Sequence, residues 1–454
     1  MTPGIEIRIL VLVILLVGPS LIRIARGEKF DPFWPPLVFA FSVFLAYLSP
    51  LPDFLDGSDA ISKVWGADFA HFNESLESAL TLVSVGVVGF YTGYFQHSRS
   101  LRGGHQFGLS TGPSLIDAAQ LKRLGLIYGI CGVGLLGAGI MMIGGWGMLV
   151  AGLSDRIRAF QGLNYFFSAI NLLLVTALLW WVYVLTKKRP RDKRFWIYTT
   201  LAVLAAALQG NKSTLLVFFL SLMMLYHILY RRIGLAWVFA GCLTLAVVLT
   251  TYALYAREYL VLGQIQTLDV AESAPSLVYD ALRSEFAGDW TGLQAMSLLV
   301  DHMPRDLGYQ YGKTFLPLIT TPIPRGLWAG KPLTAPGILT LALWPDQWLD
   351  SGTTLPPGLF GDFYMNFGGI GVAGGAFLFG KLLSAARRRW LEEKTDPIRV
   401  ILYCLLVSLI PHYIRGEFSS PTLMFLIFAI PLWVASRYVL VLPRMQGSAS
   451  PVQA

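Results

Sequence analysis

Charged residues are scarce in this 454-residue sequence. They make up 14% of it, whereas hydrophobic residues make up 55%. Because about a quarter of the residues of a soluble globular chain are charged, this composition excludes one large water-soluble enzyme. Several apolar stretches instead reach the roughly 20 residues that a helix needs to cross about 30 Å of hydrocarbon. The sequence therefore predicts an all-α polytopic membrane protein.

Cysteine and the short motifs of metal and nucleotide chemistry are also missing or rare. The three cysteines stand singly in apolar stretches, without a Cys-x-x-Cys pair or a histidine at ligand spacing, so neither a disulfide framework nor a zinc site is expected. There is no Asp-x-Asp, no His-Glu-x-x-His and no phosphate-binding loop. We therefore expect no metal and no cofactor. Lys and Arg exceed Asp and Glu by 35 to 27, but their placement favours a membrane topology over nucleic-acid binding.

The apolar stretches define about eleven candidate membrane spans. They run roughly from 5–22, 33–51, 76–96, 124–145, 160–186, 195–209, 214–230, 233–254, 358–382, 398–412 and 421–442. The segments after the odd-numbered stretches carry the basic residues, among them the run 187–194 and the cluster at 387–389. By the positive-inside rule those segments are cytoplasmic. We therefore expect a multi-pass protein of the inner (plasma) membrane, with the N-terminus outside and the C-terminus in the cytoplasm.

This topology divides the chain into four parts. We expect an N-terminal bundle of about eight helices at 1–254, an outer loop subdomain at 255–357, C-terminal membrane helices at 358–443 and a cytoplasmic tail at 444–454. A loop of a hundred residues is improbable unless it is ordered or functional. Its first half has helical apolar spacing, which predicts an amphipathic helix at 276–303 over the mouth of a cavity. The Pro-, Gly- and Trp-rich stretch 317–357 predicts an irregular ordered loop beneath it.

Cations gather on the predicted outer side, where charges near membrane depth tend to face a cavity or a partner. They include Lys212, Arg283, Arg325, Lys331 and Arg415. Any one of them could equally be an interfacial or paired structural ion, but cations from distant segments on one side favour an anionic ligand. Guanidinium and ammonium groups suit diphosphate oxygens without a metal. The candidate general bases on the same side are Glu417, Asp289, Glu285, Asp362 and His412.

Four short motifs follow one another along the second half of the chain. They are Gln209-Gly210-Asn211-Lys212-Ser213, the stretch from Pro322 through Arg325 to Lys331-Pro332, the glycine-rich stretch from Gly361-Asp362 to Gly371, and Tyr413-Ile414-Arg415-Gly416-Glu417. In this order they resemble motifs of the Wzy-type O-antigen polymerases, the family of oligosaccharide repeat-unit polymerases. The resemblance covers roughly the last 250 residues.

The resemblance implies a GT-C-like fold and an inverting, metal-independent glycosyltransferase. Such an enzyme moves a growing glycan between polyprenyl-diphosphate carriers on the outer face of the membrane, and its partners are the lipid-linked oligosaccharides, membrane lipid and a chain-length regulator protein. The catalytic candidates are Glu417, Arg415, Asp362 and His412, and the substrate-binding candidates are Lys212, Arg325, Lys331, Arg283 and Tyr364. Lys212 stands where the family often has arginine, so it keeps the charge but loses bidentate binding.

Two other functions remain open. A glycan ligase of the related fold would transfer the finished glycan to lipid A or to a protein. A flippase for lipid-linked oligosaccharides ranks third, because the sequence shows no internal repeat and its unusual polar residues favour one face.

Overall fold

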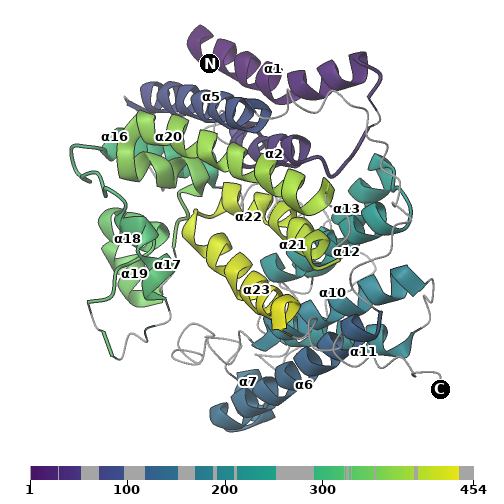
Figure 1. Ribbon diagram of the computed structural model, residues 1–454. Helices are drawn as coiled ribbons and strands as arrows, with labels where there is room; N and C mark the ends of the chain where they lie inside the picture. The colour runs from purple at the N-terminus through teal and green to yellow at the C-terminus, as the bar shows by residue number, and fades with distance from the viewer. Residues whose placement is uncertain are drawn as a thin grey trace, which may run out of the picture. The chain divides into compact units, whose positions relative to one another are not determined.

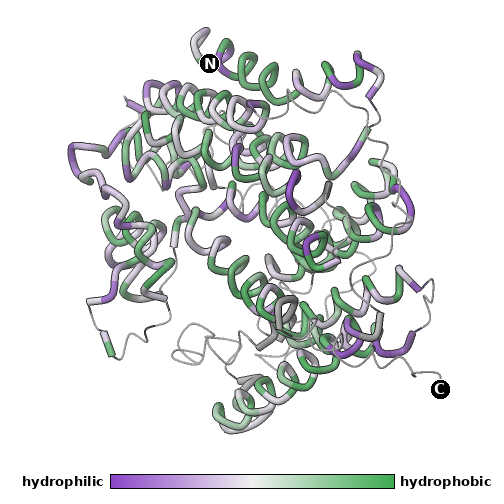
Figure 2. Tube along the Cα trace, viewed as in Figure 1, coloured by the Kyte–Doolittle hydropathy of each residue, from purple (hydrophilic) through white to green (hydrophobic). Residues whose placement is uncertain are grey.

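The computed structural model describes residues 2–28, 30–52, 71–96, 118–151, 169–187, 192–208, 212–251, 291–321, 323, 327–328, 330–351, 354–392 and 397–438. Every regular element among these residues is a helix (Figure 1). The chain forms two compact units, the first of residues 1–105, 233–387 and 406–423, and the second of residues 106–232, 388–405 and 424–454. Hydrophobic residues occupy most turns of the helices, and hydrophilic residues lie mainly at the helix ends and in the connecting segments (Figure 2).

In the described part of the chain, five helical segments are long and apolar enough to cross a membrane. They are α1 (Pro3–Ala25), α5 (Phe72–Gln96), most of α6 (Ala118–Ile143), α20 (Gly358–Ala386) with the π-helical turns that follow it, and the segment Pro397–Arg415, which comprises α21 (Pro397–Ser408) and α22 (Ile410–Arg415). The protein is thus an all-helical membrane protein. The described residues of the other predicted stretches also lie mainly in helices, but those helices are not among the five, so the number of eleven spans stays a prediction.

The first unit is organised around α5 and α20, which lie side by side (Figure 1). Three glycines of α5 at helical spacing, Gly86, Gly89 and Gly93, face α20, and a Cβ added at Gly89 would lie 2.6 Å from the carbonyl oxygen of Ala373. Small residues at such spacing let two membrane helices approach closely. Because higher-numbered residues of α5 meet higher-numbered residues of α20, the two helices run in the same direction.

Helix α1 runs parallel to α5 as well. Thr2 donates a hydrogen bond to Glu77 at 2.7 Å, Arg8 forms a 2.9 Å ion pair with Glu77, and the Tyr91 hydroxyl donates to the carbonyl of Leu16. This shared direction of α1, α5 and α20 is what the alternating charge pattern requires of the first, third and ninth stretches. Helix α2 (Pro35–Val43), extended by π-helical turns to Leu48, packs its aromatic residues against α5 and α20.

Helix α20 is broken within its length. Phe367 and Gly368 leave the helical conformation, and Gly368 has φ +61° and ψ −151°, a region essentially restricted to glycine. A break leaves carbonyls without their N–H partners four residues on. Here the carbonyls of Met365 and Asn366 accept hydrogen bonds from the N–H groups of Gln310 at 2.8 Å and Tyr311 at 3.3 Å. The predicted span 358–382 is therefore a helix in two parts, whose broken backbone is satisfied by a distant loop.

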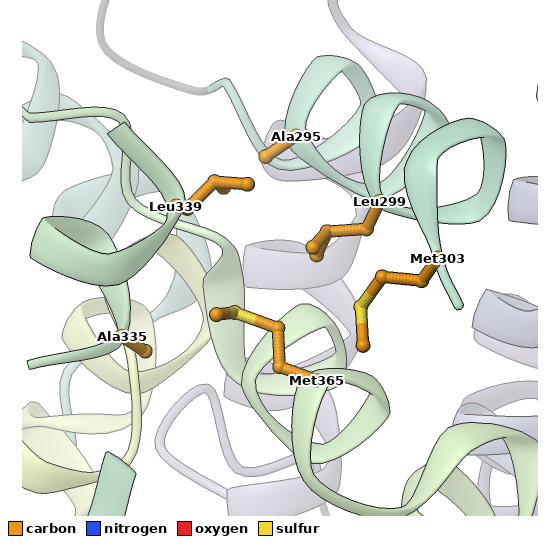
Figure 3. Close-up of a cluster of buried hydrophobic side chains, with 6 residues drawn as sticks. All are labelled: Ala295, Leu299, Met303, Ala335, Leu339 and Met365. Atoms are coloured by element: carbon orange, nitrogen blue, oxygen red, sulfur yellow. The ribbon is translucent and has the colours of Figure 1, made fainter. Parts of the chain in front are cut away.

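The described part of the predicted outer subdomain packs on α20. Helix α16 (Gly292–His302) and helix α18 (Ala335–Leu343) form a buried cluster with Met365 of α20, and the side chains of Leu299, Met303 and Met365 converge in its centre (Figure 3). The rest of the predicted amphipathic helix, 276–290, lies outside the described residues. Leu293 and Met296, two apolar residues within the predicted range 276–303, are fully buried.

The stretch 317–357 is more regular than we expected. It contains α17 (Pro317–Thr320), α18 and α19 (Pro345–Ser351). Proline stands at the first or second position of each of these short helices, where its fixed φ suits a helix start and its missing N–H costs nothing. The prolines that argued against a long helix thus begin three short ones.

The second unit contains α6, α7 (Trp146–Ala151), α10 (Ala169–Lys187), α11 (Lys193–Leu208) and α12 (Lys212–Leu229). Its core is aromatic, with Trp180 and Phe195 buried and the rings of Trp181 and Phe195 stacked at 4.6 Å. Helix α13 (Leu235–Thr251) belongs to the first unit, and α23 (Ser419–Tyr438) runs from the first unit into the second.

Candidate active site

Asp362 lies at the centre of a buried polar network in the first unit. Its side chain is fully buried in the first part of α20. One carboxylate oxygen accepts hydrogen bonds from the Thr314 hydroxyl at 2.6 Å and the Asn366 amide at 3.2 Å, and the other accepts the N–H of Phe418 at 2.9 Å. Because a buried carboxylate is stable only when its acceptors are satisfied, these three donors explain how Asp362 is tolerated. Asp362 joins three segments, and it has no exposed surface from which to act as a base.

Asn366 closes the network one helical turn later. Its amide nitrogen donates to the Thr314 hydroxyl at 2.5 Å and to the Asp362 carbonyl at 2.8 Å, while its side-chain oxygen accepts the N–H of Gly312 at 2.7 Å. Tyr311 and Gly312 both have positive φ values, +47° and +88°. Such a conformation is unusual for a tyrosine. Asn366 therefore holds this left-handed turn against α20, immediately before the break.

Glu417 lies in the link between α22 and α23 and is buried. One of its carboxylate oxygens accepts the N–H of Ala335 at 3.0 Å, and the other accepts a short hydrogen bond from the hydroxyl of Ser420. Ala335 is the first residue of α18, where orphan N–H groups and the helix dipole favour a carboxylate. Glu417 thus caps α18, while Ser420 itself is exposed.

The pKa of Glu417 is raised to about 7, first because burial removes the carboxylate from water. The hydrogen bond from Ser420 lowers it, the charge of Asp362 raises it further, and the N–H of Ala335 lowers it. A cation close to a carboxylate lowers its pKa, whereas the pKa of Glu417 moves in the opposite direction. A carboxyl group with this pKa can exchange a proton near neutral pH, as a general base must.

The backbone beside Glu417 is fixed by two glycines. The N–H of Gly358, at the start of α20, donates to the carbonyl of Gly416 at 2.8 Å. Gly358 has φ +72°, and an added Cβ would lie 2.8 Å from both the Ile414 carbonyl oxygen and the Tyr47 hydroxyl. Only glycine fits this crossing. The start of α20 and the end of α22 are therefore locked together around Arg415.

The other predicted residues in the described part of the chain lie as follows. His412 and Arg415 are half-buried on α22, with Arg415 as its last residue. Tyr364 is half-buried on α20, and its ring lies edge-on to Tyr309 with centroids 6.4 Å apart. Lys331 donates hydrogen bonds to the carbonyls of Thr321 at 3.1 Å and Ile323 at 2.9 Å. In this structure the Lys331 ammonium group therefore bonds the backbone of the segment that precedes it in the chain.

The side chains of three predicted residues lie outside the described part of the structure. Arg325 and Arg283 lie outside the described residues, and Lys212 begins α12 in the second unit without a described side chain. The predicted convergence of Lys212, Arg325 and Arg415 on a diphosphate stays a prediction. In the parts of the chain that the structure describes, no three His, Cys, Asp or Glu side chains gather as metal ligands would.

Sequence reasoning missed the partners of the two acidic residues. Thr314, Ala335 and Ser420 contact Asp362 or Glu417 directly, yet none of them lies in a stretch with an acid–base pattern. Ser419-Ser420 after an acidic residue and before an apolar helix is a helix-start signal, and this signal could have pointed to Ser420. Thr314 carries no such signal.

Residues 138–389 match the family described as "Domain of unknown function (DUF8712)". The match covers more than half of the 454 residues, and the chain belongs to this family. The matched range includes Asp362, Asn366 and the break in α20 and ends before α22. No curated protein and no solved structure matches the chain.

Proposed function

We propose that this protein is a membrane glycosyltransferase that joins polyprenyl-diphosphate-linked oligosaccharide repeat units into a surface polysaccharide. The proposed site faces the outer side of the inner membrane, the N-terminus lies outside and the C-terminus lies in the cytoplasm. One observation carries the proposal. Hydrogen bonds to two buried carboxylates join three of the motif regions. Asp362, in the glycine-rich motif, accepts the N–H of Phe418, which directly follows Arg415-Gly416-Glu417. Glu417 accepts the N–H of Ala335, three residues after Pro332, and the Gly416 carbonyl accepts the N–H of Gly358. These are motifs on which the family resemblance rests.

In the proposed reaction an acceptor sugar hydroxyl attacks the anomeric carbon of the donor glycan. A new glycosidic C–O bond forms, the C–O bond to the diphosphate breaks, and polyprenyl diphosphate leaves. The hydroxyl proton passes to Glu417, and Arg415 stabilises the negative charge on the leaving diphosphate. Asp362 is a positioning residue, because it ties Thr314, Asn366 and Phe418 together. His412 remains a catalytic candidate, Tyr364 a candidate for contact with sugar, and Lys212, Arg325, Lys331 and Arg283 candidates for contact with diphosphate.

The Ser420 hydroxyl suggests how an acceptor would reach Glu417. It already donates to a Glu417 carboxylate oxygen, and Ser420 is exposed. A sugar hydroxyl could replace it from the exposed side without disturbing the Ala335 N–H, which bonds the other oxygen. Ser420 thus occupies the position that the proposal gives to the acceptor.

The test is glycan elongation by the purified protein in lipid nanodiscs, with purified lipid-linked repeat units as both donor and acceptor. Removing one charge-stabilising group typically costs about a hundredfold or more in rate, so Arg415→Ala and Glu417→Gln should each abolish the ladder of products. Two exposed residues of the same unit supply matched controls, Arg305→Ala and Glu74→Gln, which should elongate normally. Wild-type ladders from both site variants would overturn the assignment.

The products also separate the three functions. A ladder of lengths on the polyprenyl carrier supports the polymerase. Transfer of a preformed glycan to lipid A or to a protein, without a ladder, would indicate the ligase. Passage of the lipid-linked glycan across the bilayer without a new bond would indicate the flippase.

A further inference from the structure

Residues 311–321 form a short amphipathic segment, which includes a 3₁₀ turn (Lys313–Phe315) and α17. Its buried side carries Thr314, Pro317 and Thr320 at three-residue spacing. Its opposite side exposes Leu316 and Ile319, which are three residues apart. Ile323, just beyond the end of the segment, is also exposed. Ile319 is 78% exposed, although burying such a side chain is worth about 1.5–3 kcal/mol.

The segment is fixed at the break in α20. The N–H groups of Gln310 and Tyr311 bond the carbonyls of Met365 and Asn366, and the Thr314 hydroxyl bonds Asp362. The height of the segment relative to the membrane is therefore the height of the break.

The length of α20 gives that height. The candidate span Gly358–Trp390 has 33 residues, about 50 Å of helix at 1.5 Å per residue, which exceeds the roughly 30 Å of hydrocarbon. The part from 369 to 386, between the break and the arginines that begin at Arg387, is about 27 Å long at the same rise. This part alone is close to the length that a membrane-spanning helix needs. The break then lies at one membrane surface and the arginines at the other.

An exposed apolar stripe continues from the break along α20. Phe367, Ile370, Leu378 and Leu382 are exposed at helical spacing, and Ile370 is 86% exposed. On a helix of this length and composition, such a stripe is the side that faces lipid. It begins next to the turn that carries Tyr311. The exposed side of the 311–321 segment is thus continuous with a lipid-facing surface.

We propose that the 311–321 segment lies in the membrane interface at the level of the α20 break, with Leu316 and Ile319 inserted among lipid acyl chains. The occupant of its exposed face is the phospholipid bilayer. Lys313 is exposed at the start of the segment, where an ammonium group reaches lipid phosphates. Since Thr314 of the segment bonds Asp362, lipid insertion fixes the buried polar network at the membrane surface. The inference does not depend on the proposed function or on which side of the membrane faces outward.

The test measures the depth of single cysteines in nanodiscs of phosphatidylcholine and phosphatidylglycerol. In a background with Cys131, Cys242 and Cys404 replaced, Ile319→Cys carries an environment-sensitive fluorophore. Leu378→Cys is the lipid-facing control, and Arg305→Cys, whose native side chain is 70% exposed, is the aqueous control. Melting curves equal to that of the unlabelled parent show that each variant is folded.

The label at position 319 should show blue-shifted emission, be quenched by lipids with a spin label near the headgroup and resist a water-soluble quencher. The label at Arg305→Cys should show the reverse, and that at Leu378→Cys should respond to spin labels deeper in the acyl chains. A label at 319 that behaves like the one at 305 would overturn the proposal. Shielding from both lipid and aqueous quenchers would also overturn it, because it would mean that another protein surface covers the segment.

Discussion

Replacing Asn366 with leucine tests whether the buried network holds the broken helix. The two side chains have similar size, so the change removes hydrogen bonds without opening a large cavity. The Gly312 N–H loses its acceptor, while Asp362 keeps Thr314 and the Phe418 N–H. One orphaned buried donor costs about 1–3 kcal/mol, and the lost bonds to Thr314 and the Asp362 carbonyl bring the total to roughly 2–4 kcal/mol.

The measurement is the melting curve of the purified protein in detergent, combined with hydrogen exchange. The free-energy loss should appear as a lower melting temperature, and exchange should rise at Gln310 to Gly312, whose N–H groups bond the residues before the break. Ser84→Ala is the matched control, because its hydroxyl bonds only the Leu80 carbonyl of its own helix. That variant should stay within about 0.5 kcal/mol of wild type. If Asn366→Leu melted and exchanged like Ser84→Ala, the network would not hold the break.

Three further outcomes follow from the same contacts. Gly93→Ala should destabilise the protein by about 1–3 kcal/mol, because the added Cβ would overlap the Phe377 carbonyl of α20. The control Gly18→Ala, which has open space around it, should be neutral or stabilising. Equal melting temperatures for the two variants would contradict the close α5–α20 contact. If Glu417 is the base, the value of kcat/KM for elongation should fall about tenfold per pH unit below a pKa of about 7 and level off above it, because only the carboxylate accepts the proton. A kcat/KM that does not change with pH in this range would show that Glu417 is not the base. Elongation should persist in a chelator of divalent cations, and its complete loss would refute a metal-free reaction.

The sequence by itself determined the helical architecture. A helix in lipid must satisfy its backbone internally and be apolar along its length, so the helices could be located from local composition. The described residues of the predicted stretches lie mainly in helices, and five of these segments are long and apolar enough to cross a membrane. The charge pattern also requires α1, α5 and α20 to run in one direction, as they do. The glycines of α5 and the motifs around Asp362 and Glu417 were visible in the sequence as unusual positions in apolar surroundings.

Only the tertiary structure decided what those positions do. Asp362 bonds Thr314, 48 residues earlier, and Glu417 bonds Ala335, 82 residues earlier, and no local period reports such partners. The break at Gly368 also depends on distant partners. Glycine permits a φ of +61° but does not require it, and an unbroken apolar helix fits the same residues. The break exists because Gln310 and Tyr311 supply the N–H groups that the parted helix needs, and their approach depends on how the chain folds between them.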